Sequence, residues 1–153
     1  MFSSAGGRLT PSRRLAGLAL SAVGIEGVSI LGGEPFLQAR ALAAFAREVR
    51  QGGLSVMVYS GFTLDELRSG AVEGAEALLA ETDLLVDGRY VRELPERRRR
   101  WVGSQNQVVH HLTGRYAEDD PRFFMPNTVE LRLTRDGLTV NGWPGSSKVL
   151  GGR

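Results

Sequence analysis

Three short apolar runs of this chain each end in glycine beside polar or charged residues. The segments that follow them are Gly32-Gly33-Glu34-Pro35, Ser60-Gly61-Phe62-Thr63 and Asp87-Gly88-Arg89. Glycine allows a ligand to approach the backbone closely, and exposed carbonyl groups beside a carboxylate suit a bound ammonium group. The spacing matches neither a GxGxxG nor a GxxxxGK[ST] phosphate-binding loop. Taken singly, each segment is more typical of a glycine turn with solvated charges.

The elements that carry these segments alternate between strand and helix. Apolar runs bounded by turn residues predict strands, and helical periodicity predicts the helices between them. The expected strands cover 28–31, 54–59 and 84–86, and the expected helices cover 11–23, 38–51 and 63–80. This alternation is typical of a parallel sheet, whose strands present their carboxyl ends at one edge. The three candidate segments should therefore lie together.

Local signals fix where these elements should begin and end. Thr10 is the expected N-cap of the first helix, with Gly24 closing it. Thr63 and Glu66 have the spacing of a capping box. Two glycines, Gly70 and Gly74, should weaken the middle of the third helix. The first strand reads as one buried on both faces, because its apolar residues are continuous.

The alternation stops after Gly88. A basic run, 97–100, leads into a polar segment, 103–107, and a short apolar run follows. The polar amides could line a pocket or simply form a turn. Apolar residues on both sides of Asp136-Gly137 predict a β-hairpin. The whole chain, 1–153, is interpreted as a single domain, with 143–153 as a flexible tail.

Composition narrows the classes of protein. The chain of 153 residues has no cysteine, which excludes disulfides and thiolate-bound metals within it. No apolar run approaches the roughly 20 residues that span a bilayer, so a cytoplasmic protein without a membrane partner is expected. A net charge of +2 does not indicate nucleic acid. The basic run 97–100 fits a solvated face or a surface that binds an acidic partner.

His110 and His111 should point to opposite faces of a strand, which suits a structural role better than binding of one metal ion.

Four motifs taken together have a more specific meaning. The stretches GVSILGGEPFLQ, VMVYSGFTLDEL, LLVDGRY and WVGSQNQ occur in this order between about residues 8 and 115. They resemble the radical S-adenosylmethionine enzymes, most of all the activating proteins of anaerobic ribonucleotide reductase and related glycyl-radical activases. The resemblance implies an α/β fold, namely a partial (β/α) barrel of the radical S-adenosylmethionine type with a C-terminal β-hairpin.

The resemblance also implies a set of cofactor-binding residues. Gly32, Gly33 and Glu34 would contact the amino group of the methionine moiety of S-adenosylmethionine. Ser60 matches the polar residue after the next strand. Asp87 and Arg89 match the position where relatives contact the ribose and the methionine carboxylate. An aspartate can accept hydrogen bonds from hydroxyls, and an arginine can pair with a carboxylate.

One part of the family pattern is missing. These enzymes hold a 4Fe-4S cluster on a CxxxCxxC motif, and the cluster drives reductive cleavage of S-adenosylmethionine. The chain has no cysteine, so we expect it to begin just after the cluster loop, to have no metal ligands or catalytic residues of its own, and to be inactive as it stands.

The resemblance implies a function for the complete protein. It would form a glycyl radical on a partner, the large subunit of anaerobic ribonucleotide reductase, with electrons from a donor such as flavodoxin or ferredoxin. The alternative is a non-catalytic module that binds S-adenosylmethionine or a partner on a degenerate scaffold. A third arrangement is a split enzyme whose cysteines come from another chain.

Overall fold

The computed structural model describes residues 10–125, 129–134 and 137–142 as a mixed α/β structure. Its main sheet has four strands in the order β1-β2-β3-β4. The strands are β1 (Gly27–Ile30), β2 (Ser55–Tyr59), β3 (Leu84–Asp87) and β4 (Val108–His111). The first three run parallel, and β4 runs antiparallel to β3. The predicted parallel α/β arrangement is therefore confirmed.

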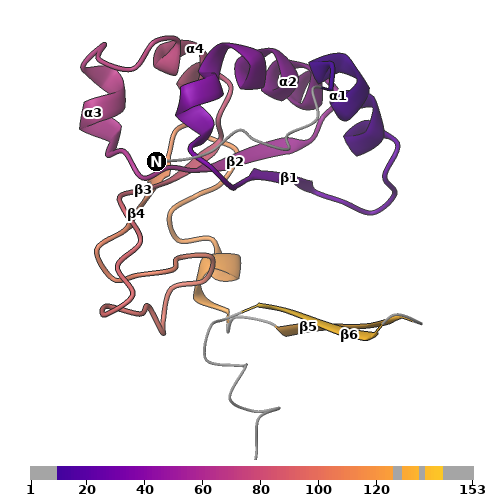
Figure 1. Cartoon of the computed structure of the whole chain (residues 1–153), viewed down its shortest axis with the longest axis vertical. Helices are drawn as coiled ribbons and strands as arrows, with labels where there is room; N and C mark the ends of the chain where they lie inside the picture. The colour runs from indigo at the N-terminus through magenta and orange to yellow at the C-terminus, as the bar shows by residue number, and fades with distance from the viewer. Residues whose placement is uncertain (1–9, 126–128, 135–136, 143–153) are drawn as a thin grey trace, which may run out of the picture.

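The helices that precede and connect the parallel strands gather on one face of this sheet (Figure 1). They are α1 (Ser12–Leu20), the 3-10 helix η1 (Pro35–Gln38), α2 (Ala39–Gln51), α3 (Leu64–Arg68) and α4 (Ala75–Ala80). A second 3-10 helix, η2 (Pro121–Phe124), follows β4. Among the described residues no helix is long and apolar enough to cross a membrane.

The core lies on both faces of the two central strands. On the helical face Val56, Val58 and Leu85 pack with buried residues of α2 such as Ala46 and Val49. Alternate residues of the same strands form a second cluster on the other face, built on Met57, Leu84 and Val86. Side chains of a strand alternate between faces, so a continuous apolar run fills two cores.

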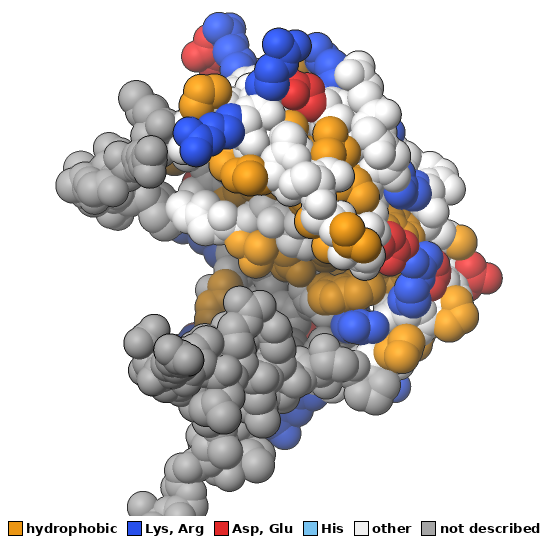
Figure 2. Space-filling view, turned by 90° about the vertical axis from the view of Figure 1, so that its right-hand side faces the viewer, with side chains coloured by type: hydrophobic (Ala, Val, Ile, Leu, Met, Phe, Trp, Pro, Cys, Tyr) orange, Lys and Arg blue, Asp and Glu red, His pale blue; other side chains and the backbone are white. Residues whose placement is uncertain are grey.

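The prediction that the first strand is buried on both faces is wrong. In β1 the side chains are half-buried or, at Ser29, exposed. The physical reason is position, since β1 is the edge strand and pairs only with β2 among the described residues. Figure 2 shows hydrophobic side chains on the side of the molecule where α1 and β1 lie. Leu18, Val23 and Leu31 are exposed hydrophobic residues, Val23 by 98%.

The capping box at Thr63 and Glu66 is confirmed, because each residue's side chain accepts from the other's backbone N–H. The single helix predicted over 63–80 is wrong. Gly70 and Gly74 both take a positive φ, of 80° and 76°, and divide the segment into α3 and α4. A left-handed residue cannot continue a right-handed helix, so these glycines end one helix and start the next.

Two further boundary predictions need correction. Thr10 does not cap α1, since Pro11 occupies the N-cap position without a side-chain hydrogen bond. The helix ends at Leu20 with Ser21 as C-cap, three residues before the last position expected of it and four before Gly24. The predicted hairpin is confirmed as β5 (Val129–Thr134) paired with β6 (Gly137–Gly142). The expected tail, 143–153, lies outside the described residues.

Candidate ligand-binding site

The carboxylate of Glu34 connects the loop after β1 to the loop after β2. Its Oε1 accepts hydrogen bonds from the Ser60 hydroxyl at 2.9 Å and from the Phe36 N–H at 3.1 Å. Its Oε2 accepts from the Gly61 N–H at 2.8 Å. Three donors therefore hold the carboxylate, and both predicted residues, Glu34 and Ser60, lie in direct contact.

Gly32 and Gly33 form the turn that brings Glu34 to this position. Their φ angles are 84° and 55°, a left-handed conformation that other residues adopt only with strain. A Cβ atom on either glycine would meet nothing within 4 Å. The backbone angle, rather than crowding, therefore requires glycine here, and the exposed turn leaves room for a ligand beside Glu34.

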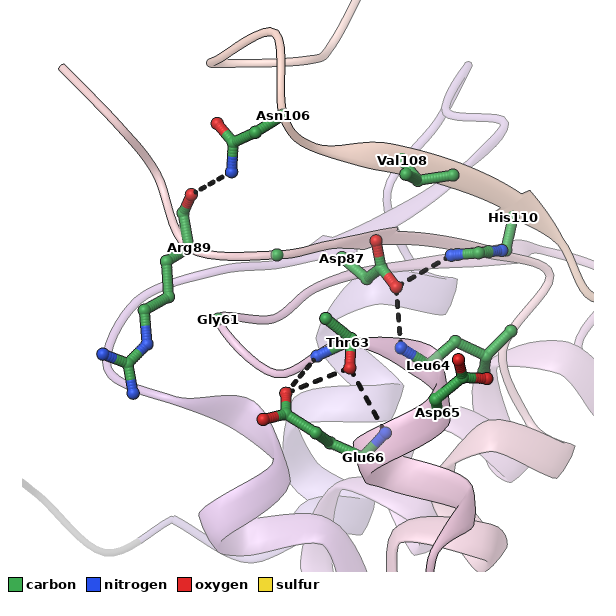
Figure 3. Close-up of a pocket in the computed structure, with 11 residues that line it drawn as sticks. Gly61, Thr63, Leu64, Asp65, Glu66, Asp87, Arg89, Asn106, Val108 and His110 are labelled. Atoms are coloured by element: carbon green, nitrogen blue, oxygen red, sulfur yellow. Dashed lines mark hydrogen bonds and ion pairs between the residues drawn. The ribbon is translucent and has the colours of Figure 1, made fainter. Parts of the chain in front are cut away.

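A cleft of about 480 Å³ lies next to this junction, at the carboxyl ends of β2 and β3 (Figure 3). Such a volume is within the range of small-molecule sites. Gly61 contributes to its lining, and so do two predicted residues, Asp87 and Arg89. Gly32, Gly33, Glu34 and Ser60 do not line the cleft. Gly61 links the two groups, since it lines the cleft and donates to Glu34.

Asp87 is buried at the end of β3 and does more than face the cleft. Its Oδ2 accepts a hydrogen bond of 2.6 Å from the Leu64 N–H and so fixes the start of α3. The Nε2 atom of His110 lies 2.8 Å from the same oxygen. Oδ1 accepts no hydrogen bond from the described residues, which leaves one carboxylate oxygen for a ligand.

Arg89 is exposed on the rim of the cleft. Its carbonyl accepts from the Asn106 side chain at 2.8 Å, but its guanidinium forms no hydrogen bond or ion pair with a described residue (Figure 3). The guanidinium acts on its neighbour electrostatically. The N–H of Thr63 does most to lower the pKa of Glu66, followed by the Thr63 hydroxyl, and the charge of Arg89 adds to this. Arg89 is thus a cation available to an anionic ligand group.

The polar segment 103–107 both lines the cleft and fastens it. Asn106 contributes to the lining, as one of the two interpretations of this segment predicts. Gln107 is buried and structural instead. Its Oε1 accepts from the N–H groups of Gly103 and Ser104, and its Nε2 donates to the Gly88 carbonyl, all at 3.0 Å. These hydrogen bonds hold the segment against the end of β3.

The structure adds His110 to the residues that line the cleft. Sequence reasoning assigned both histidines structural roles, and only the pairing of β4 with β3 brings His110 beside Asp87. His111 behaves as expected, because its Nδ1 lies 3.1 Å from the Tyr116 carbonyl and its ring packs against Phe123. The described part of the chain contains no group of three or more histidine, aspartate or glutamate side chains that could hold a metal ion.

Comparison with known proteins identifies the family. Residues 8–110 match the model of the 4Fe-4S single cluster domain. The chain belongs to this family. The match covers β1 to β4 up to His110, and therefore includes every residue of the candidate site.

Curated proteins similar to this chain include the anaerobic ribonucleoside-triphosphate reductase-activating proteins of Escherichia coli strain K12 and Vibrio cholerae. The first is 32% identical over 91 residues, which are 57% of this chain and 56% of the relative. The second is 33% identical over 93 residues, or 58% and 57% of the two chains. The resemblance drawn from the four motifs is confirmed, and the chain spans a little over half the length of these relatives. No solved structure matches it.

The residues present do not fit the iron–sulfur cluster of the family. Cysteine thiolates are the ligands of such clusters, and this chain has none. The candidate site instead offers one carboxylate held by three donors, one free carboxylate oxygen and one free guanidinium. This set of groups suits an organic ligand that carries both an ammonium and a carboxylate.

Proposed function

We propose that this domain is the S-adenosylmethionine-binding part of an activating protein for anaerobic ribonucleoside-triphosphate reductase. The observation that carries the proposal is the Glu34–Ser60–Gly61 junction beside a cleft lined by Asp87 and Arg89. Such convergence of polar groups at the carboxyl ends of parallel strands is typical of ligand sites in α/β folds. The relatives' names support the choice of partner, and the resemblance of the four motifs supports the choice of ligand.

Each residue has a distinct role in this proposal. The amino group of the methionine moiety binds Glu34 and the adjacent carbonyls of Gly32 and Gly33. The free Oδ1 of Asp87 accepts from a ribose hydroxyl, and Arg89 pairs with the methionine carboxylate. The four-stranded sheet, with helices on one face, forms part of a (β/α) barrel that positions these groups.

The complete protein would cleave S-adenosylmethionine reductively and form a glycyl radical on the reductase. A donor such as flavodoxin or ferredoxin would supply the electron, and cluster ligands would come from outside these residues. The contribution of this chain is to bind and orient the cofactor.

Isothermal titration calorimetry with S-adenosylmethionine tests the proposal. We expect the wild-type domain to bind it and Glu34→Gln to weaken binding at least tenfold, because the ammonium loses its counter-charge. Glu93→Gln is the matched control, since Glu93 is exposed and forms no hydrogen bond or ion pair with the described residues. No binding by the wild type, or equal affinity in a folded Glu34→Gln variant, would contradict the proposal.

The absence of cysteine favours a second candidate function, a module that binds S-adenosylmethionine without cleaving it. Anaerobic incubation of the domain with iron and sulfide separates the two. Binding of S-adenosylmethionine that is unchanged by iron and sulfide supports the module. Binding that appears only with bound iron contradicts this second candidate function.

A further inference from the structure

One side chain of the cleft has a hydrogen-bonding atom that the fold leaves unused. The Nε2 atom of His110 is shielded from water and has no hydrogen-bond partner among the described residues. It lies 2.8 Å from Oδ2 of Asp87, but without hydrogen-bond alignment, and that oxygen already accepts from the Leu64 N–H. Buried polar atoms nearly always have a partner, so an exception points to one that is absent.

The neighbouring histidine shows that the fold does satisfy such a side chain elsewhere. His111 has the Tyr116 carbonyl 3.1 Å from its Nδ1 and packs edge-on against Phe123 at 4.9 Å. His110 lies on the opposite face of β4, and its side chain is 26% exposed toward the cleft. Of the two adjacent histidines, only His110 lines this cleft.

His110 and Asp87 present complementary hydrogen-bonding groups in the same cleft (Figure 3). The free Oδ1 of Asp87 only accepts, whereas an imidazole nitrogen donates or accepts according to its tautomer. A vicinal diol supplies two neighbouring hydroxyls, each able to donate and accept. One hydroxyl can therefore donate to Asp87 while the other completes the hydrogen bonding of His110.

We propose that His110 is a ligand-contacting residue that binds, together with Asp87, the vicinal diol of a ribose. On binding, the imidazole turns from Oδ2 of Asp87 toward the ligand. This inference deepens the proposed function, on which it rests, because the ribose is that of the adenosyl group. It makes the cleft selective for ribosides over deoxyribosides.

The first experiment compares two phenylalanine variants by calorimetry with S-adenosylhomocysteine. His110→Phe keeps a ring but removes both nitrogens, and His111→Phe is the matched control on the other face of β4. We expect His110→Phe to weaken binding about tenfold, as for one lost hydrogen bond to a ligand, and His111→Phe to leave affinity unchanged. His110→Gln, which can still donate and accept, should recover part of the loss.

The second experiment measures how much each ribose hydroxyl contributes to affinity. Adenosine is compared with 2′-deoxyadenosine and 3′-deoxyadenosine in the wild type and in His110→Phe. In the wild type the loss of either hydroxyl should weaken binding about tenfold. In His110→Phe the loss of one hydroxyl should have no further effect, because its partner is already gone. Undiminished discrimination of both hydroxyls in a folded His110→Phe would overturn the inference.

The outcomes separate this inference from the proposed function. If the wild type does not bind S-adenosylhomocysteine at all, both are overturned. If it binds but the two phenylalanine variants behave alike, only the inference is overturned. Should His110→Phe fail to fold, nuclear magnetic resonance of the unaltered protein decides, since it has only two histidines. Saturating ligand must then shift the His110 ring signal and not that of His111, and an unmoved His110 signal overturns the inference.

Discussion

The hydroxyl of Ser60 donates to Oε1 of Glu34 across 2.9 Å, and thereby joins residues that are 26 positions apart in the sequence. The same hydroxyl oxygen accepts from the Phe62 N–H at 3.0 Å. Ser60 is thus the link between the loop after β2 and the carboxylate of the loop after β1. In the proposed site the carboxylate of Glu34 is therefore held in place before any ligand arrives, which would reduce the entropy lost on binding.

Removing this link should loosen Glu34 without removing its charge. We expect Ser60→Ala to weaken S-adenosylmethionine binding less than Glu34→Gln does, and to lower the free energy of unfolding by about 1 kcal/mol. Calorimetry and urea denaturation measure the two effects. Ser21→Ala is the control, because Ser21 donates to the Leu18 carbonyl on an exposed surface away from the site. A Ser60→Ala variant indistinguishable from this control would contradict the assigned role.

The arginine run should divide into structural and dispensable members. Arg99 donates to Oε2 of Glu96 and to the carbonyls of Gln105 and Gln107, whereas Arg98 forms no side-chain hydrogen bond with a described residue. We expect Arg99→Ala to lower the free energy of unfolding by about 1–3 kcal/mol and Arg98→Ala to change it by less than about 0.5 kcal/mol. Urea denaturation measures both, and equal effects would refute the division.

Glu96 should make the stability of the domain sensitive to acid. Its pKa falls from an ordinary value of 4.5 to about 2, mainly through the Arg98 N–H, with the side chain of Arg99 and two further N–H groups adding to it. A carboxyl whose pKa is lower in the folded state than in the unfolded state stabilises the fold at pH values above its unfolded-state pKa. This stabilisation should disappear as the pH falls from about 4.5 to about 2.

Thermal unfolding measured across this pH range, for the wild type and Glu96→Gln, checks the prediction. The difference in melting temperature between the two proteins should shrink as the pH falls. Asp120 also has a pKa lowered to about 2, chiefly by the Arg122 side chain, so both proteins keep some pH dependence. A difference in melting temperature that stays constant would argue against a role for ionised Glu96.

Two glycine substitutions should act in opposite directions. Gly17 lies within α1 without a positive φ, and a Cβ atom there would meet nothing within 4 Å. Gly17→Ala should therefore raise the free energy of unfolding by about 0.5–1 kcal/mol. Gly74 has a φ of 76°, and a Cβ atom would lie 2.8 Å from Cγ of Arg40. Gly74→Ala should lower the free energy of unfolding, and urea denaturation of both variants tests the pair.

Local patterns predicted the parallel strands, the capping box and the hairpin, because each depends on residues close in sequence. They did not predict that α3 and α4 are separate, since a helical glycine is only weakly unfavourable until its φ is known. Nor did they show that β1 is an edge strand, because apolar content does not specify neighbours. The tertiary arrangement determines both the separation of α3 from α4 and the edge position of β1.

The candidate site likewise has features that local patterns predicted and features that depend on the tertiary arrangement. The positions of Glu34, Ser60, Asp87 and Arg89 at strand ends follow from the βαβ pattern. The second role of Asp87, as the acceptor for the Leu64 N–H, depends on how α3 meets β3. His110 reaches Asp87 only because β4 pairs antiparallel with β3, with Leu85 opposite His110. The antiparallel pairing of β4 with β3 could not be deduced from the apolar residues after Gly88 alone.

The position of β1 at the edge of the sheet has a practical consequence for work with the isolated domain. An edge strand exposes backbone hydrogen-bonding groups, and β1 contains neither lysine nor proline to block pairing with another molecule. Exposed Leu31 lies at its end and Val23 precedes it. Purified domain should therefore aggregate as its concentration rises, and Ser29→Lys, which places a charge at an exposed strand position, should raise the concentration at which solutions turn cloudy.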